Sequence, residues 1–192
     1  MKKALLLGVL ISGLAFGQTK KLISSDVHWW GYKIAKTEAS SHDGTVNVKS
    51  GNLVLKNGSV VGGQFVLDMT TINATDLSGE YQGKLNGHLK NGDFFEVEKY
   101  PEMTFVSTST KKVSDTKFTL TGYLTMHGVT KPVTLDVDYY GSVVNPMNQK
   151  ETFGFHIAGT LKRTEFGIAP NFPTQVVGDD ISIVADAEFV KE

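Results

Sequence analysis

Residues 117–140 read KFTLTGYLTMHGVTKPVTLDVDYY, and this stretch decides the fold. Apolar and polar residues alternate on both sides of the short segment from Met126 to Thr130. Side chains of one parity lie on one face of a strand, so each half of the stretch has one apolar and one polar face. The pattern predicts an antiparallel hairpin within a closed or sandwiched β structure. A barrel of about eight such strands encloses either a packed core or one small apolar ligand.

Similar runs occur along the rest of the chain, each flanked by turn residues. They are Asp26–Ile34, Thr45–Lys49, Asn52–Lys56, Ser59–Thr70, Glu102–Thr110, Glu151–Lys162 and a final run through Ile181 and Phe189. Between two of them, Asn57 and Gly58 both tolerate positive φ and therefore predict a tight hairpin turn. Together the runs predict an all-β chain of about eight or nine antiparallel strands.

The segment from residue 75 to residue 100 breaks the strand pattern. Here a large apolar or aromatic residue recurs at every fourth position, at Leu77, Tyr81, Leu85 and Leu89. That spacing is typical of a helix, although Gly83 and Gly87 each cost about 1 kcal/mol of helix propensity relative to Ala. The sequence therefore predicts a short, weak helix across the barrel mouth, between the early and the late strands.

The first 17 residues have the three parts of a secretory signal. Lys2 and Lys3 precede an apolar run from Ala4 to Phe16, and Ala15-Phe16-Gly17 has small residues at the cleavage positions. We expect residues 1–17 to be a signal peptide, the protein to be exported to the periplasm, and residues 18–192 to form a single domain. The apolar run is shorter than the roughly 17 to 25 residues that a spanning helix needs, so we expect no transmembrane segment in the mature chain.

Composition and motifs exclude several classes of function. With 19 basic and 20 acidic residues the net charge is −1, which gives no strong field for attracting nucleic acid or an anionic membrane. The chain has no cysteine, so disulfides, thiolate metal sites and thiol nucleophiles are excluded. It also lacks the Gly-x-Ser-x-Gly, His-Glu-x-x-His and glycine-rich phosphate-loop motifs. The sequence thus predicts no catalytic residue, no metal site, no cofactor and no nucleic-acid partner.

Three blocks of sequence carry a resemblance to a known family. They are GHLKNGDFFEVEKYP at 87–101, LTGYLTMHGVTKPV at 120–133 and RTEFGI at 163–168. With these blocks in this order, the chain resembles the YceI-like family of exported proteins along essentially its whole mature length. The resemblance implies a lipocalin-like antiparallel β-barrel whose interior holds a polyisoprenoid, quinone-like or fatty-acyl amphiphile. The expectation of a homodimer rests on the resemblance alone.

One region departs from the family. The early strands of the family are usually richer in Phe, whereas this chain has His28-Trp29-Trp30 and a shorter segment from Ser40 to Val46. Because early strands help to shape the interior, the departure bears on the identity and length of the ligand rather than on the fold.

The predicted ligand-binding walls are aromatic and apolar side chains. The candidates are Trp29, Phe65, Leu67, Phe94, Phe105, Tyr123, Phe153 and Phe155. Tyr123 is included for its hydroxyl group and not for its parity. Periodicity alone favours a solid core over a cavity, since any packed barrel needs alternating apolar residues, and the resemblance reverses that preference.

A polar head group would need partners at the mouth of the barrel. The side chains considered are His42, His88, His127, Arg163 and Glu165. His88 adjoins the pair of phenylalanines and is the preferred ligand contact, whereas His127 is expected to be exposed or bonded within its turn. Arg163 and Glu165 are two residues apart, so we expect them to form a structural ion pair on one strand face.

The leading interpretation is an exported lipid-binding protein that performs no covalent chemistry. The alternative is a filled barrel that acts as a surface interaction module, using outward aromatics such as Trp30 and Tyr32. An isomerase or hydrolase with a mouth histidine ranks last, because the sequence supplies no second catalytic group.

Overall fold

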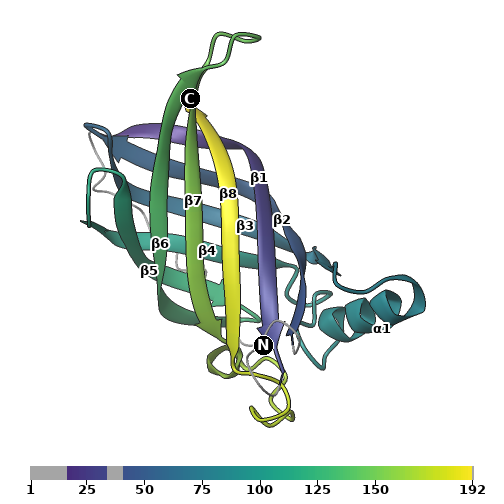
Figure 1. The fold of residues 1–192 in the computed structure, drawn as a ribbon. Coiled ribbons are helices and arrows are strands. Elements are labelled where there is room, and N and C mark those ends of the chain that lie inside the picture. The colour runs from purple at the N-terminus through teal and green to yellow at the C-terminus, as the bar shows by residue number, and fades with distance from the viewer. Residues whose placement is uncertain (1–16, 34–40, 192) are drawn as a thin grey trace, which may run out of the picture.

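Eight antiparallel strands form a closed barrel in the computed structural model, which describes residues 17–33 and 41–191 (Figure 1). The strands are β1 (Gln18–Tyr32), β2 (Ser41–Lys56), β3 (Ser59–Ala74), β4 (Glu102–Lys112), β5 (Lys117–Met126), β6 (Val129–Val144), β7 (Glu151–Lys162) and β8 (Asp180–Lys191). Each strand pairs with the next along the chain, and β8 closes on β1. The predicted barrel with a helix between its early and late strands is confirmed. The predicted signal peptide lies outside the described residues except for Gly17.

The hairpin of β5 and β6 has the register and faces that its alternation predicts. Lys117 pairs with Asp138 at one end and Met126 with Val129 at the other. In the turn, His127 and Gly128 have φ values of 51° and 74°, and Asn57 and Gly58 repeat these values between β2 and β3. Such turns have the twist of the strands they join. The two predicted turns therefore fix the register of two hairpins.

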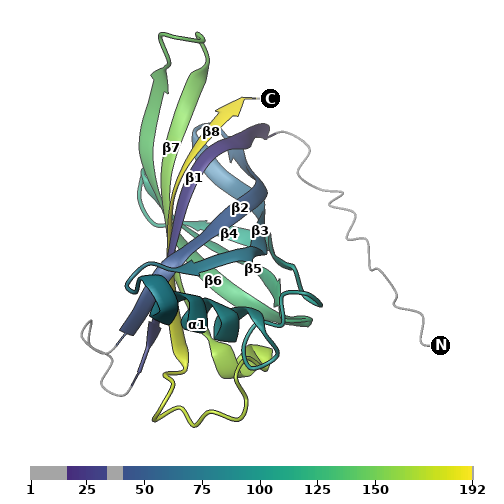
Figure 2. The same ribbon diagram turned by 90° about the vertical axis from the view of Figure 1, so that its right-hand side faces the viewer.

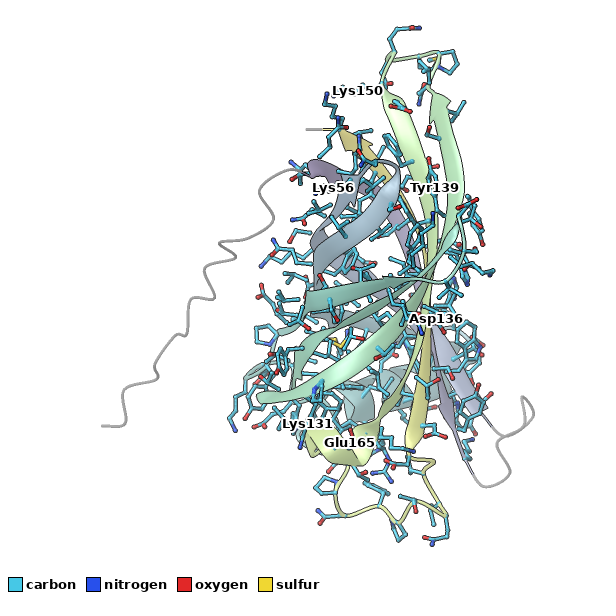
Figure 3. All side chains as sticks on the ribbon, turned by 90° about the vertical axis from the view of Figure 1, so that its left-hand side faces the viewer. Lys56, Lys131, Asp136, Tyr139, Lys150 and Glu165 are labelled. Atoms are coloured by element: carbon cyan, nitrogen blue, oxygen red, sulfur yellow. The ribbon has the colours of Figure 1, made fainter. Side chains whose placement is uncertain are left out.

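The two ends of the barrel differ in what covers them. One end carries the 3₁₀ helix η2 (Arg163–Phe166), the loop 167–179 and the helix α1 (Gly79–Lys90), and we call this end the mouth. The far end carries the turns at 57–58 and 145–150, and β6 and β7 extend beyond it as a hairpin (Figure 1). Figure 3 shows Lys131 and Glu165 toward the mouth and Lys56 and Lys150 toward the far end.

Helix α1 lies outside the barrel beside the mouth end of β3 (Figure 2). Two of its side chains bind the last residue of that strand: Gln82 Nε2 donates to the Ala74 carbonyl, and Asn86 Oδ1 accepts from the Ala74 N–H, both at 2.8 Å. The side chain of Ser78 makes no capping hydrogen bond, and Leu89 is the buried residue of the helix. The helix forms where its spacing predicts, but it lies beside the mouth and not across it, and few groups attach it to the barrel.

Strands β1 and β2 pair in two separate stretches. Residues 18–21 face 52–55 toward the far end, and residues 28–32 face 41–45 toward the mouth. The intervening residues, 22–27 and 46–51, are not paired with one another in this part of the described chain. The wall of the barrel therefore contains a local separation of two neighbouring strands, which we call the split.

Candidate functional site

The mouth end of the barrel encloses an apolar chamber of about 400 Å³, which we call the mouth chamber. Trp29 of β1 and Met69 of β3 contribute from the barrel wall, and Leu85 and Leu89 contribute from α1. Phe172 contributes from the loop 167–179. Two strands, one helix and one loop thus close one apolar volume.

A smaller chamber of about 80 Å³, the inner chamber, lies deeper in the barrel. Both chambers are lined by Met103, Leu161 and Ile183, so these three side chains form the boundary between them. Ser25 is the one residue with a polar side chain among those described that line the inner chamber. The two chambers therefore lie next to each other, divided by these three side chains, and we call the pair the apolar path.

Small residues on the inward face create the inner chamber. Ala185 and Ala187 of β8 and Gly159 of β7 line it. A Cβ atom at Gly159 would lie 2.6 Å from Leu135 Cδ2, so a side chain there would displace Leu135 on the neighbouring strand β6. Sequence analysis did not single out these residues for the site. Their signal was present, because small residues at inward parity on adjacent strands leave space.

Aromatic side chains close the path beyond the inner chamber. The rings of Phe65 and Phe189 meet edge to face with centroids 6.3 Å apart, and those of Phe155 and Phe189 do so at 5.5 Å. Lys20 Nζ lies 4.0 Å from the ring centroid of Phe153. Burial lowers the pKa of the Lys20 ammonium, and the charge of Glu151 opposes that shift. A lipid tail that enters from the mouth would thus meet this aromatic plug at the far end of the path.

Most of the predicted wall residues lie inside the barrel, but in three different places. Trp29 and Phe94 line the mouth chamber, where Phe94 packs on Phe172 with centroids 5.8 Å apart. Phe65, Leu67 and Phe105 line the inner chamber. Phe153 and Phe155 are buried but belong to the plug.

The placement of Tyr123 in the interior wall is wrong. Its side chain is 55% exposed and lies on the outer face of β5. Its neighbours Leu120 and Leu124 are buried. In a strand the side chain's parity determines its face, and a hydroxyl group cannot reverse it.

The histidines considered at the mouth already have partners. His42 Nδ1 lies 2.7 Å from Asp76 Oδ2, and His88 Nδ1 lies 3.3 Å from Asp93 Oδ2. Both histidines line the mouth chamber, as predicted for His88. His127 is not exposed: its Nδ1 lies 3.2 Å from the Phe166 carbonyl, which ties the β5–β6 turn to η2. Each ring is held by a neighbouring acceptor.

Arg163 binds the protein's own backbone rather than Glu165. Its side chain is 1% exposed, and all five of its N–H donors are used. The acceptors, at 2.7–3.1 Å, are the carbonyl oxygens of Ile168, Ala169, Phe172, Val177 and Gly178. Burial lowers the pKa of this guanidinium, and Asp179 opposes the shift. The predicted ion pair is wrong, because the chain leaves the strand at Lys162 and the two residues lie in a 3₁₀ turn with Glu165 exposed.

The loop 167–179 is the part of the site that sequence analysis missed. Phe172 and Val176 line the mouth chamber although both are partly exposed. Apolar residues in a loop follow no strand or helix period, so their composition was the only available signal. Arg163 holds this loop in the shape that turns Phe172 toward Phe94.

Neither a metal-binding cluster nor a membrane-spanning helix occurs among the described residues. Residues 17–33 and 41–191 contain no group of three or more His, Cys, Asp or Glu side chains placed to hold a metal ion. Within the same residues, no helix has both the length and the apolar character needed to cross a membrane.

Known proteins with similar sequences cover most of the chain. The model of the family described as YceI-like domain matches residues 23–189. A UPF0312 protein of Pseudomonas putida strain GB-1 is 33% identical over 184 residues, which cover 94% of this chain and 93% of the relative. A UPF0312 protein of strain F1 is 43% identical over 97 residues, and the aligned part of the chain spans about half of that relative's length.

Solved structures share the fold. The crystal structure of a Campylobacter jejuni YceI protein is 27% identical with a TM-score of 0.64, covering 77% of this chain and 84% of its own. A polyisoprenoid binding domain from Saccharophagus degradans has a TM-score of 0.57 at 12% identity, covering 92% and 99%, which shows a shared fold. On the family model and the nearly full-length Pseudomonas relative, this chain belongs to the YceI-like family.

Proposed function

We propose that this protein binds an amphiphile with a long apolar tail inside its barrel, and sequesters or carries it without covalent chemistry. The tail would be a polyisoprenoid, quinone-like or fatty-acyl chain. The observation that carries the proposal is the apolar path formed by the two chambers. The Saccharophagus domain of the same fold is described as binding a polyisoprenoid, which supports this class of ligand.

The energetics of tail burial support binding without a charged anchor. Burying ten methylene groups contributes roughly 8 kcal/mol at about 0.8 kcal/mol each. Part of this offsets the loss of translational and rotational freedom on association. A hydrophobic wall distinguishes one methylene by only about 1 to 3 kcal/mol, so the protein would select tails by length more than by chemistry.

The proposal includes export to the periplasm. Its support is the amino-terminal pattern of Lys2 and Lys3 followed by the apolar run from Ala4 to Phe16. Cell fractionation and the intact mass of the recovered protein test it. We expect a periplasmic protein that begins at Gln18, and a cytoplasmic protein of full mass would contradict export.

Native mass spectrometry of protein purified without detergent tests the binding function. We expect a stoichiometric adduct of one long-chain lipid, which solvent extraction identifies. The matched variants are Phe105→Glu, in the inner chamber, and Val106→Glu, the next residue on the outer face of β4. The first should lose the lipid and the second should keep it.

A filled barrel makes the opposite prediction. A wild-type protein that carries no lipid and takes up neither added prenyl nor acyl lipids would refute the proposal. Circular dichroism shows whether Phe105→Glu remains folded. If it does not, Phe105→Leu in the same position supplies a milder change, which should weaken binding without abolishing it.

A further inference from the structure

The split between β1 and β2 coincides with an irregularity in each strand. The register of β1 against β8 shifts between Leu22 and Ser24, and that of β2 against β3 shifts between Val48 and Ser50. A bulge bends its strand and interrupts pairing, and bulges are common beside functional sites. Two bulges at the same level hold the strands apart at one place in an otherwise closed wall.

A hollow of about 480 Å³ lies on the outer side of the split. Leu22, Ser25 and Val48 line both this hollow and the inner chamber. The wall between solvent and the apolar path is therefore formed here by these side chains, with no strand pairing between residues 22–27 and 46–51. Among the described strands, the split thus brings the interior close to the side of the barrel.

The hollow offers hydrogen-bond donors and no carboxylate of its own. Lys21 and Lys49 are the charged residues that line it, beside the hydroxyl groups of Ser24 and Ser50 and the amide of Asn47. Lys49 Nζ also lies 2.5 Å from Glu102 Oε1, outside the hollow. This set of groups suits an anionic acceptor.

The mouth chamber is also lined by one lysine, Lys33, but its other donors are largely used. The five donors of Arg163 are used by backbone carbonyls, and the rings of His42 and His88 each have a carboxylate partner. We propose that the split binds the anionic head group of the amphiphile, a carboxylate or a phosphate, while the tail occupies the two chambers. This inference rests on the proposed function and locates the head at the side of the barrel instead of the mouth.

The spacing of the lining residues gives the tail length. Along β1, Ser25 lines the hollow and the inner chamber, and Gly31 lines the mouth chamber. Six steps of about 3.3 Å give roughly 20 Å, the extended length of an alkyl chain of about 16 carbons. The neighbouring strand β8 gives the same span, because Ala187 pairs with Ser25 and Ile181 with Gly31. A tail of this length with its head at the split reaches the mouth.

Charge reversal in the hollow tests the head-group site. The ligands are palmitate, farnesyl monophosphate and the corresponding alcohols, hexadecanol and farnesol, titrated against an apolar fluorescent probe. In Ser50→Glu we expect the dissociation constants of palmitate and farnesyl phosphate to rise at least tenfold and those of both alcohols to stay within about twofold. If only palmitate binding weakens, the site takes a carboxylate. If only farnesyl phosphate binding weakens, the site takes a phosphate. The control is Ser109→Glu, the same change on an exposed residue of β4, which should affect no ligand.

A second measurement does not depend on the added charge. Because the chain has no cysteine, Ser24→Cys introduces a single thiol at the split, and Ser109→Cys is its control. Bound palmitate should slow the alkylation of Ser24→Cys at least fivefold and leave the alkylation rate of Ser109→Cys unchanged. If the wild type binds palmitate but neither Ser50→Glu nor Ser24→Cys responds, the head is not at the split. If the wild type binds no probe and no lipid, the proposed function itself fails.

Discussion

Filling the inner chamber should weaken lipid binding sharply, and Ala185→Phe is the change that does so. Ala185 lies on the inward face of β8, pairs with Val27 and lines the chamber. Along β8 the chamber extends from Ile183 to Ala187, about 13 Å, so blocking it at Ala185 excludes about 7 Å, or roughly five methylenes of an extended tail. Losing their burial costs about 4 kcal/mol at about 0.8 kcal/mol each.

That free energy corresponds to nearly three orders of magnitude in the dissociation constant, at about 1.4 kcal/mol per factor of ten. A displaced tail keeps part of its contacts in the mouth chamber, so we expect palmitate to bind Ala185→Phe about 100-fold more weakly. Competitive titration with an apolar fluorescent probe measures the change. The inner chamber lies on the path of the tail whichever end the head group occupies.

The control is Val184→Phe, the next residue of β8, whose side chain lies on the opposite face of the sheet. Its palmitate affinity should remain within about twofold of the wild type. Overpacking can cost about 1 to 3 kcal/mol, so thermal unfolding must first show that Ala185→Phe is folded. A folded Ala185→Phe that binds palmitate as the wild type does would refute the assignment of the chamber to the ligand.

Three further predictions concern other parts of the molecule. Arg163→Met should lower the free energy of unfolding by about 3 kcal/mol or more, because five carbonyls lose their donors, three of them in buried hydrogen bonds, and an unchanged melting temperature would contradict this. Burial holds the pKa of Lys20 below 10.5, so the unfolded chain binds the proton more tightly and wild-type stability should rise with pH between the lowered value and 10.5. Denaturant titrations should show that Lys20→Met reduces this rise. Tyr123→Ala should leave lipid affinity unchanged, and a loss would restore Tyr123 to the site.

The barrel could be predicted from local chemistry because parity and turn residues are local signals. The alternation in residues 117–140 and the turns at Asn57-Gly58 and His127-Gly128 suffice for two hairpins. The helix is equally visible in the sequence, because a large apolar or aromatic residue recurs at every fourth position. The interior position of Phe65, Leu67 and Phe105 follows from the same parity.

The predictions are wrong where parity is not followed or no longer applies. An interior position for Tyr123 rests on its hydroxyl and contradicts its parity, and its exposure shows that parity prevails. For Arg163 parity is applied beyond the end of the strand, where residues two apart no longer share a face. The partners of Arg163 are carbonyls, which every residue has, so no residue type in the sequence marks them.

The size of the chambers and the split depend on features that alternation hides. Space inside the barrel comes from Gly159, Ala185 and Ala187, which occupy inward positions but have side chains too small to fill them. The alternation of apolar and polar residues does not reveal this difference in size. The split arises from bulges, each of which moves the inward set by one residue. In β1, Leu22 faces inward at even parity, and Val27 and Trp29 face inward at odd parity. The adjacent apolar residues Leu22 and Ile23 are the trace that this shift leaves in the sequence.

The unequal attachment of the two covers at the mouth has a consequence for kinetics. Loop 167–179 is tied by five hydrogen bonds to one buried guanidinium, whereas α1 is joined to the end of β3 mainly through Gln82 and Asn86. Local opening proceeds first where the fewest buried contacts must break. We therefore expect α1 to act as the moving side of the mouth and the loop as the fixed side. Loosening α1 with Gln82→Ala would then speed both uptake and release of a lipid while leaving their ratio, the affinity, nearly constant.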